Sequence, residues 1–208
     1  MQLLYSDTMK NILFLLLFIP TICLAQINAD TAHKAAPLQD SILGTSFILN
    51  DHSVIFQKVY TSVLSKDQLI SRLKYFLPTV KNFKLSASTI ENSDLLTGRI
   101  VDFMVNYQKF GGSDDYNTSM LAYPVQANVI VQVKDNRYRV TVSEIIFKGF
   151  QNSSPIIAIN TPLDDLVSIN QRTKVRTADR YLKIAKFVSD DLSMSFDVSA
   201  TNNISSNF

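Results

Sequence analysis

The sequence predicts an α+β domain, in which an antiparallel sheet of about five strands carries two helices on one face. Two observations lead to this class. Several segments alternate apolar and polar residues, which is the pattern of strands with one buried face. Two other segments repeat apolar residues every three or four positions, which is the pattern of amphipathic helices. Their order along the chain predicts the topology β-α-β-β-β-β-α.

The first predicted elements are a hairpin, or one bulged long strand, over residues 47–61 and a helix over about 66–77. Apolar runs flank turn-forming residues at 50–53, which favours a strand on each side of a turn. Ser65 and Gln68 have the spacing of a capping box, in which each side chain satisfies a free backbone N–H at the start of a helix.

Four further strands are predicted from the alternation of apolar residues. Val101, Phe103 and Val105 share one parity, so we expect them to face the core together. Asp135 and Asn136 join the last two strands as a two-residue turn, because both residue types tolerate the positive φ that such a turn needs. The strands are expected at about 83–90, about 96–107, about 121–134 and about 137–148.

The second helix is predicted at about 174–193, after a long polar connection that contains Pro155 and Pro162. Apolar residues in this segment recur at spacings of three and four, so the helix has one apolar face. The α+β domain is therefore expected to occupy residues 46–194. A disordered tail rich in Ser and Asn is expected over 195–208.

The first 25 residues have the three parts of a secretory signal peptide, namely Lys10, an apolar run over 12–19 and a cleavage-like site at Ala25. We therefore expect an exported protein that is periplasmic, associated with the outer membrane or secreted. The apolar run is shorter than the about 18 residues that suggest a spanning helix, so no transmembrane segment is expected after cleavage. Residues 26–45 are expected to form a flexible leader.

The N-terminal region leaves three alternatives open. Met9 is an alternative start to Met1, and Cys23 is an alternative site of lipid attachment. Thr31 and Ser41 lie in tripeptides of the form Asp-Ser/Thr-apolar, which resemble acceptor sites for O-glycosylation in exported bacterial proteins. Such tripeptides also occur by chance, so both hydroxyls are candidates for modification and no more.

The composition excludes several classes of enzyme. The chain of 208 residues has two His, one Cys and five Gly, which leaves little material for metal clusters, thiol chemistry or phosphate-binding loops. We therefore expect no catalytic residues, no metal and no cofactor. Paired acids could still serve acid–base chemistry, although neighbouring side chains on a strand or helix point apart. The pairs are Asp114-Asp115, Asp164-Asp165 and Asp190-Asp191.

Three short motifs carry a resemblance to a known family. They are Phe47-Ile48-Leu49-Asn50-Asp51, then Val54-Ile55-Phe56 followed by the Ser65-capped helix, and above all Val133-Lys134-Asp135-Asn136-Arg137-Tyr138-Arg139. They resemble uncharacterised exported bacterial proteins whose domain has a fold like that of the TATA-binding protein, here called TBP-like. The family usually has Gly where Asn136 stands, a change that the turn accepts. The resemblance covers roughly 45–195 and implies the fold, whereas the family has no assigned activity or catalytic residues to carry over.

The strongest charge asymmetry lies between Arg172 and Lys186, where six residues are basic and one is acidic. Arg176, Arg180 and Lys183 follow spacings of four and three on the predicted second helix, so they are candidates for binding anionic lipid, polysaccharide or an acidic protein. A solvated helix face is the alternative. We expect no nucleic-acid partner, because an exported chain with a net charge of +2 shows no basic sheet surface.

Three hypotheses on function follow. The first is a non-catalytic module of the bacterial envelope that binds another macromolecule or a surface, because the fold is specified while reactive residues are scarce. The second is a carrier of a small apolar ligand or lipid, held between helix and sheet. The third is a hydrolase that uses paired acids. The carrier's cavity would be lined by aromatic residues that otherwise fill the core, namely Phe76, Phe103, Tyr107, Tyr138, Tyr181 and Phe187.

Overall fold

A computed structural model of the chain describes residues 39–86, 94–114, 118–151 and 158–201. Its main sheet has eight strands, all paired antiparallel, in the order β1-β2-β3-β7-β6-β5-β4, with β8 also paired to β7. The predicted α+β class is confirmed, and the predicted number of strands was too low. The strands are β1 (Gln39–Ser41), β2 (Phe47–Asn50), β3 (Ser53–Thr61), β4 (Phe83–Leu85), β5 (Leu95–Phe103), β6 (Val125–Lys134), β7 (Arg137–Gln151) and β8 (Ala158–Pro162).

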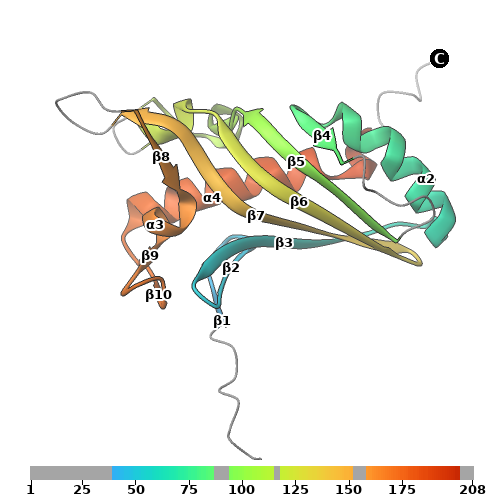
Figure 1. Ribbon diagram of the computed structural model, residues 1–208, viewed down its shortest axis with the longest axis horizontal. Coiled ribbons are helices and arrows are strands. Elements are labelled where there is room, and N and C mark those ends of the chain that lie inside the picture. The colour runs from blue at the N-terminus through green and yellow to red at the C-terminus, as the bar shows by residue number, and fades with distance from the viewer. Residues whose placement is uncertain (1–38, 87–93, 115–117, 152–157, 202–208) are drawn as a thin grey trace, which may run out of the picture. The chain divides into compact units, whose positions relative to one another are not determined.

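Within the described ranges, three α-helices accompany this sheet. Figure 1 shows α4 running along the sheet behind strands β5, β6 and β7, with α2 near the opposite end from α3. A small separate hairpin, formed by β9 (Ser168–Ile169) and β10 (Lys174–Val175), precedes α4. The helices are α2 (Lys66–Phe76), α3 (Leu163–Val167) and α4 (Asp179–Ser195), with 3-10 turns at Leu77–Thr79, Tyr107–Phe110, Ser119–Ala122 and Val198–Thr201.

Both long helices pack on the same face of the sheet. Along β6 the buried residues, such as Val129 and Val131, alternate with Ile130, which is 41% exposed. The buried strand residues form one core cluster with Leu73 of α2 and Val188 of α4. The other parity of the strands faces away from this core, so the described sheet has one covered face and one open face.

The hairpin between β6 and β7 has the predicted two-residue turn, and it is tied to the start of α2. Asn136 has a φ of 60°, as the turn requires. Asp135 Oδ1 accepts a hydrogen bond from the backbone N–H of Lys66 (2.9 Å), and Ser62 N–H donates to the carbonyl of Asn136 (2.8 Å). At the same point Gln68 Oε1 accepts from the backbone N–H of Ser65 (3.0 Å), as the capping-box pattern predicts. The end of this hairpin is therefore fixed by several hydrogen bonds.

The alternation predicted around Val101 is wrong at that residue. Asp102 takes a left-handed φ of 57°, and the pairing of β5 with β6 shifts register between Ile100 and Phe103. This bulge adds one residue to β5, so Ile100 and Phe103 are both buried while Val101 is only half-buried. Such a bulge interrupts the alternation of buried and exposed residues along the strand.

The predicted polar connection before the second helix is also wrong. That segment contains β8, α3 and the hairpin of β9 and β10. Leu163 and Val167, the first and last residues of α3, are fully buried. Because Lys174 and Val175 belong to β10, α4 begins at Asp179 and not at 174.

Both expected limits of the domain need correction. Residues 39–41 form β1 and Ile42 is 1% exposed, so the end of the expected leader belongs to the fold. Phe196 and Val198 are buried, so the start of the expected tail belongs to it as well. Isolated apolar residues among polar ones produce no periodic signal, which is why the sequence did not reveal them.

Candidate functional site

The open face of the sheet gathers basic side chains beside the turn between β6 and β7. Arg137 and Arg139 are two residues apart on β7, so both point away from the buried parity of that strand. The strand register places Lys134 opposite Arg137, and places both Gln132 and Val59 opposite Arg139. Strands β6 and β7 thus bring three cations to one corner of the sheet, beside Val59 of β3.

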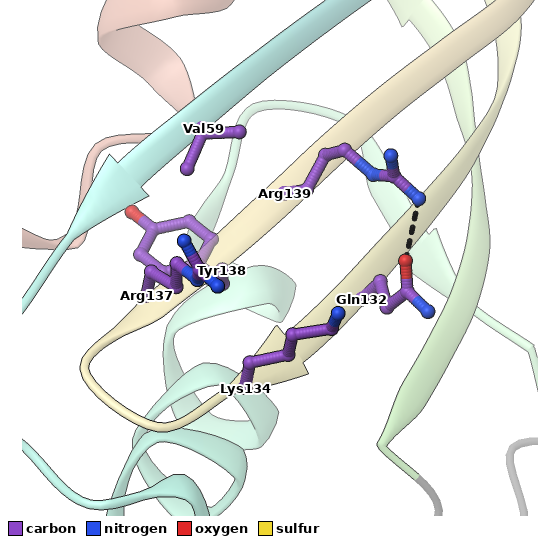
Figure 2. A pocket seen from close by; sticks show the side chains of 6 residues that line it. All are labelled: Val59, Gln132, Lys134, Arg137, Tyr138 and Arg139. Atoms are coloured by element: carbon purple, nitrogen blue, oxygen red, sulfur yellow. Dashed lines mark hydrogen bonds between the residues drawn. The ribbon is translucent and has the colours of Figure 1, made fainter.

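These side chains line a shallow pocket of about 220 Å³. Figure 2 shows Lys134 and Arg137 toward the turn, and Arg139 farther along β7 beside Gln132. An Nη atom of Arg139 donates a hydrogen bond to Gln132 Oε1 (2.6 Å), which holds the guanidinium beside the neighbouring strand β6. Tyr138, which also lines the pocket, is buried and closes it from beneath.

No described carboxylate forms an ion pair with Lys134, Arg137 or Arg139. Two acids near this corner are engaged by Lys66 at the start of α2. Asp94, whose carbonyl accepts from the N–H of Val133, has its Oδ2 3.5 Å from Lys66 Nζ, and Asp135 accepts from the backbone N–H of Lys66. Three exposed like charges within one pocket repel one another, and this repulsion is relieved when an anion binds. The corner is therefore suited to an anionic group.

Two more cations extend this surface across the sheet. Arg99 of β5 lies opposite Asn128 of β6, and Lys84 of β4 lies opposite Arg99. Both side chains are exposed. We use the name basic sheet face for the set formed by Lys84, Arg99, Lys134, Arg137 and Arg139.

Acidic side chains approach the open face at the end away from the turn. Glu144 Oε2 accepts a hydrogen bond from the amide of Asn128 (2.7 Å). Beyond it, Asp102 Oδ1 forms an ion pair with Lys148 Nζ (2.7 Å). The uncompensated positive charge is therefore concentrated near the turn, where Arg137 and Lys134 lie.

The expectation that the sheet has no basic surface was wrong. Arg137 and Arg139 could be placed on one face from their spacing alone. The predicted two-residue turn also places Lys134 opposite Arg137, whereas Arg99 and Lys84 join them only through the long-range pairing of β6 with β5 and of β5 with β4. The net charge of +2 gave no sign of this local concentration.

The basic residues predicted to bind a surface are placed differently. Arg176 lies before α4, so the helical spacing used to group it with Arg180 and Lys183 does not apply to it. Its Nε donates to the carbonyl of Ser168 (3.0 Å). The guanidinium carbons of Arg176 and Arg180 lie 4.7 and 4.4 Å from the centre of the Tyr181 ring. These two arginines are thus occupied by contacts within the chain, and Lys183 is exposed on α4.

Arg172, in the same basic run, is paired with acids. Its guanidinium nitrogens lie 3.2 Å from Asp164 Oδ2 and 2.8 Å from Asp165 Oδ1. Asp164 also accepts from the backbone N–H of Val54 (2.8 Å), and burial raises the pKa of its carboxyl. This acid pair therefore joins the α3 region to β3, which is a structural role.

The other predicted acid pairs also have partners of their own. Asp190 forms an ion pair with Lys186 (2.8 Å), whereas Asp191 accepts from the backbone N–H of Asn106 (2.7 Å). Asp114 accepts from the hydroxyl of Tyr107, and Asp115 lies outside the described residues. Each described carboxylate of these two pairs is therefore engaged in a contact within the chain.

The remaining predictions from the sequence concern signal cleavage, O-glycosylation, metal binding and membrane spans. Ala25 and Thr31 lie outside them, while Ser41 is exposed in β1. His52 Nδ1 lies 2.9 Å from the carbonyl of Gln171. Within the described ranges, no three His, Cys, Asp or Glu side chains are grouped to hold a metal ion. None of the helices in those ranges is long and apolar enough to span a membrane.

The aromatic residues proposed to line a ligand cavity are mostly engaged in packing. Phe103 and Phe187 are core residues, and the Tyr107 ring packs at 6.3 Å from the ring of Phe187. Tyr138 stacks on Tyr60 at 4.9 Å. In this part of the chain the aromatic side chains fill the space between α4 and the sheet.

Comparisons with known proteins give a fold-level likeness. No protein-family model matches the chain, and no curated protein matches it. Two solved structures do. One is a TBP-like protein from Parabacteroides distasonis, with 15% identity and a TM-score of 0.49 over 73% of this chain and 95% of that one. The other is a DUF4468 family protein from Bacteroides ovatus, with 16% identity and a TM-score of 0.47 over 70% of this chain and 84% of that one.

Proposed function

We propose that this protein is a non-catalytic, exported binding module that recognises an acidic macromolecule through its basic sheet face. The observation that carries the proposal is the pocket formed by Lys134, Arg137 and Arg139, in which three exposed cations have no described acidic partner. Export remains an expectation based on the N-terminal sequence.

Two further features support binding on this face. The pocket is built on paired strands, and the turn beside it is fixed to α2, so the cations are presented by a rigid frame. Val59, which lines the pocket, is 54% exposed, so a partner could bury apolar area as well as neutralise charge. A carrier function receives less support, because the aromatic side chains between α4 and the sheet are packed against one another.

The test is a charge reversal on the sheet face. Poly-glutamate with a fluorescent label is titrated with the wild-type protein and with the Arg137→Glu/Arg139→Glu double variant at low and at physiological salt. We expect the double variant to bind about tenfold more weakly or worse, because it loses two attractive charges and gains two repulsive ones. We also expect wild-type binding to weaken as salt rises.

A matched variant separates the two basic surfaces of the molecule. Arg180→Glu/Lys183→Glu makes the same change in charge on α4, the surface predicted from the sequence. We expect it to bind like the wild type to within about twofold. If this variant loses binding and the sheet-face variant keeps it, the proposed site is wrong. Thermal unfolding of all three proteins establishes that each is folded.

A further inference from the structure

The basic sheet face has apolar residues between its cations, and this pattern defines the partner more closely. We propose that the face binds an extended acidic segment of a partner protein, with carboxylates toward both ends of the segment and an aliphatic side chain between them. This inference rests on the proposed function, since it concerns the same surface.

The cations are separated by a distance that suits an extended peptide. Lys134 lies six residues along β6 from Asn128, which is level with Arg99 and Lys84. Six residues of strand span about 20 Å, and the two strand spacings from β6 to β4 add about 10 Å sideways, so the diagonal is roughly 22 Å. A peptide of about seven residues covers this length when it is extended.

Two exposed aliphatic side chains, Ile130 and Leu95, lie between the two groups of cations, and Val59 lies beside the group near the turn. Ile130 on β6 is 41% exposed. Along β6 it lies between Lys134 and Asn128, and Asn128 is paired with Arg99. The strand pairing places four residues side by side on β3, β7, β6 and β5, namely Val59, Arg139, Gln132 and Leu95. The two outer residues of this row, Val59 and Leu95, are 54% and 40% exposed. Each aliphatic residue is thus within one or two strands of an arginine.

This combination favours a protein segment over other polyanions. Proteins that bind single-stranded nucleic acid stack bases on exposed aromatic side chains, whereas the exposed apolar residues of this face are aliphatic and the Tyr138 side chain is buried. Membrane-surface sites use aromatic residues at the lipid interface, which the same set lacks. Arginine beside aliphatic side chains is a composition common at protein interfaces. A second copy of this chain would bring cations against cations, so the partner is a different, acidic protein.

The experiment measures binding of three labelled heptapeptides by fluorescence anisotropy. The first has two acids at each end and a central Leu between two Ser, the second replaces Leu by Ser, and the third keeps Leu and replaces the acids by their amides. We expect the first to bind about three- to tenfold more tightly than the second, because part of one aliphatic side chain is buried. The third should show no measurable binding. In the Ile130→Ser variant the first and second peptides should bind equally.

The outcomes distinguish this inference from the proposed function. If the first two peptides bind the wild type equally, and Arg137→Glu/Arg139→Glu weakens both, the face binds anions without reading an apolar residue and the inference is overturned. It is also overturned if dextran sulfate, single-stranded oligonucleotide or phosphatidylglycerol vesicles bind through these arginines while the peptides do not. If no anionic probe depends on the two arginines, the proposed function itself is wrong.

Discussion

Asp191 shows how one buried carboxylate holds a loop to α4. Its side chain is 5% exposed and accepts a hydrogen bond from the backbone N–H of Asn106 (2.7 Å). Burial raises the pKa of this carboxyl, and the hydrogen bond, Lys81 and Lys109 only partly oppose the increase. The ionised form is therefore less favourable in the folded protein than in the unfolded chain.

The sign of this shift gives a prediction for stability against pH. A carboxyl with a raised pKa in the fold contributes stability that is present at low pH and is lost as pH rises from about 4 through the folded-state pKa. Asp191→Asn keeps an acceptor for Asn106 and cannot ionise. We expect the free energy of unfolding of Asp191→Asn, measured in urea, to increase relative to that of the wild type from pH 4 to pH 7, by ~1.4 kcal/mol for each unit of the pKa shift.

The neighbouring substitution Asp190→Asn is the control for losing a charge on α4. Asp190 is less buried and is paired with Lys186. If the free energies of unfolding of Asp191→Asn and wild type differ by the same amount at every pH from 4 to 7, burial does not shift the pKa of this carboxyl.

Two stacked tyrosines fasten the end of α4 to the sheet. The rings of Tyr60 on β3 and Tyr138 on β7 lie parallel, 4.9 Å apart. Tyr60 OH donates to the carbonyl of Ser193 (2.9 Å), while Tyr138 OH donates to the carbonyl of Phe196 (2.8 Å) and accepts from the N–H of Val198 (3.0 Å). The hydroxyls thus satisfy backbone groups that the end of a helix leaves without partners. Burial raises the pKa of both tyrosines, so both stay protonated.

The two hydroxyls are expected to differ in their contribution to stability. Tyr138→Phe leaves a buried carbonyl and a buried N–H unsatisfied, so we expect a loss of about 1–3 kcal/mol in the free energy of unfolding. Tyr60→Phe removes one hydrogen bond, whose acceptor residue Ser193 is half-buried, and should cost about 1 kcal/mol. Tyr75→Phe, at a side chain that is 83% exposed, should change nothing. Equal costs at Tyr60 and Tyr138, measured by urea denaturation, would refute this assignment.

At the scale of elements, the sequence predicted those that have strong local signals. The helix after Ser65 and the hairpin at Asp135 and Asn136 were predicted nearly at their observed positions, because a capping box and a two-residue turn depend on adjacent residues. The elements between Phe150 and Lys174 were missed. Their strands and helix are only two to five residues long, which is too short for a periodic pattern to show.

At the scale of the whole molecule, the two faces of the sheet have different roles. One face is covered by α2 and α4 and forms the core, and the other presents the basic sheet face. The chain's net charge of +2 conceals this division. Arg176 and Arg180 were predicted to bind a surface because they are close together in the chain. In the structure both guanidinium groups lie over the Tyr181 ring, and Arg176 also donates to a backbone carbonyl. Lys134 faces Arg137 across the two-residue turn that the sequence predicted, whereas Arg99 and Lys84 join this face only through the pairing of β6 with β5 and of β5 with β4, which no local pattern reveals.

The most direct test of the central claim is to locate a bound polyanion on the folded protein. Backbone amide chemical shifts of the ¹⁵N-labelled protein would be followed during a titration with poly-glutamate at low salt. The account predicts that the shifts change in β6 and β7 around Gln132, Lys134, Arg137 and Arg139, and that they leave the middle of α4 unchanged. Changes confined to Arg180, Lys183 and their neighbours on α4 would contradict it.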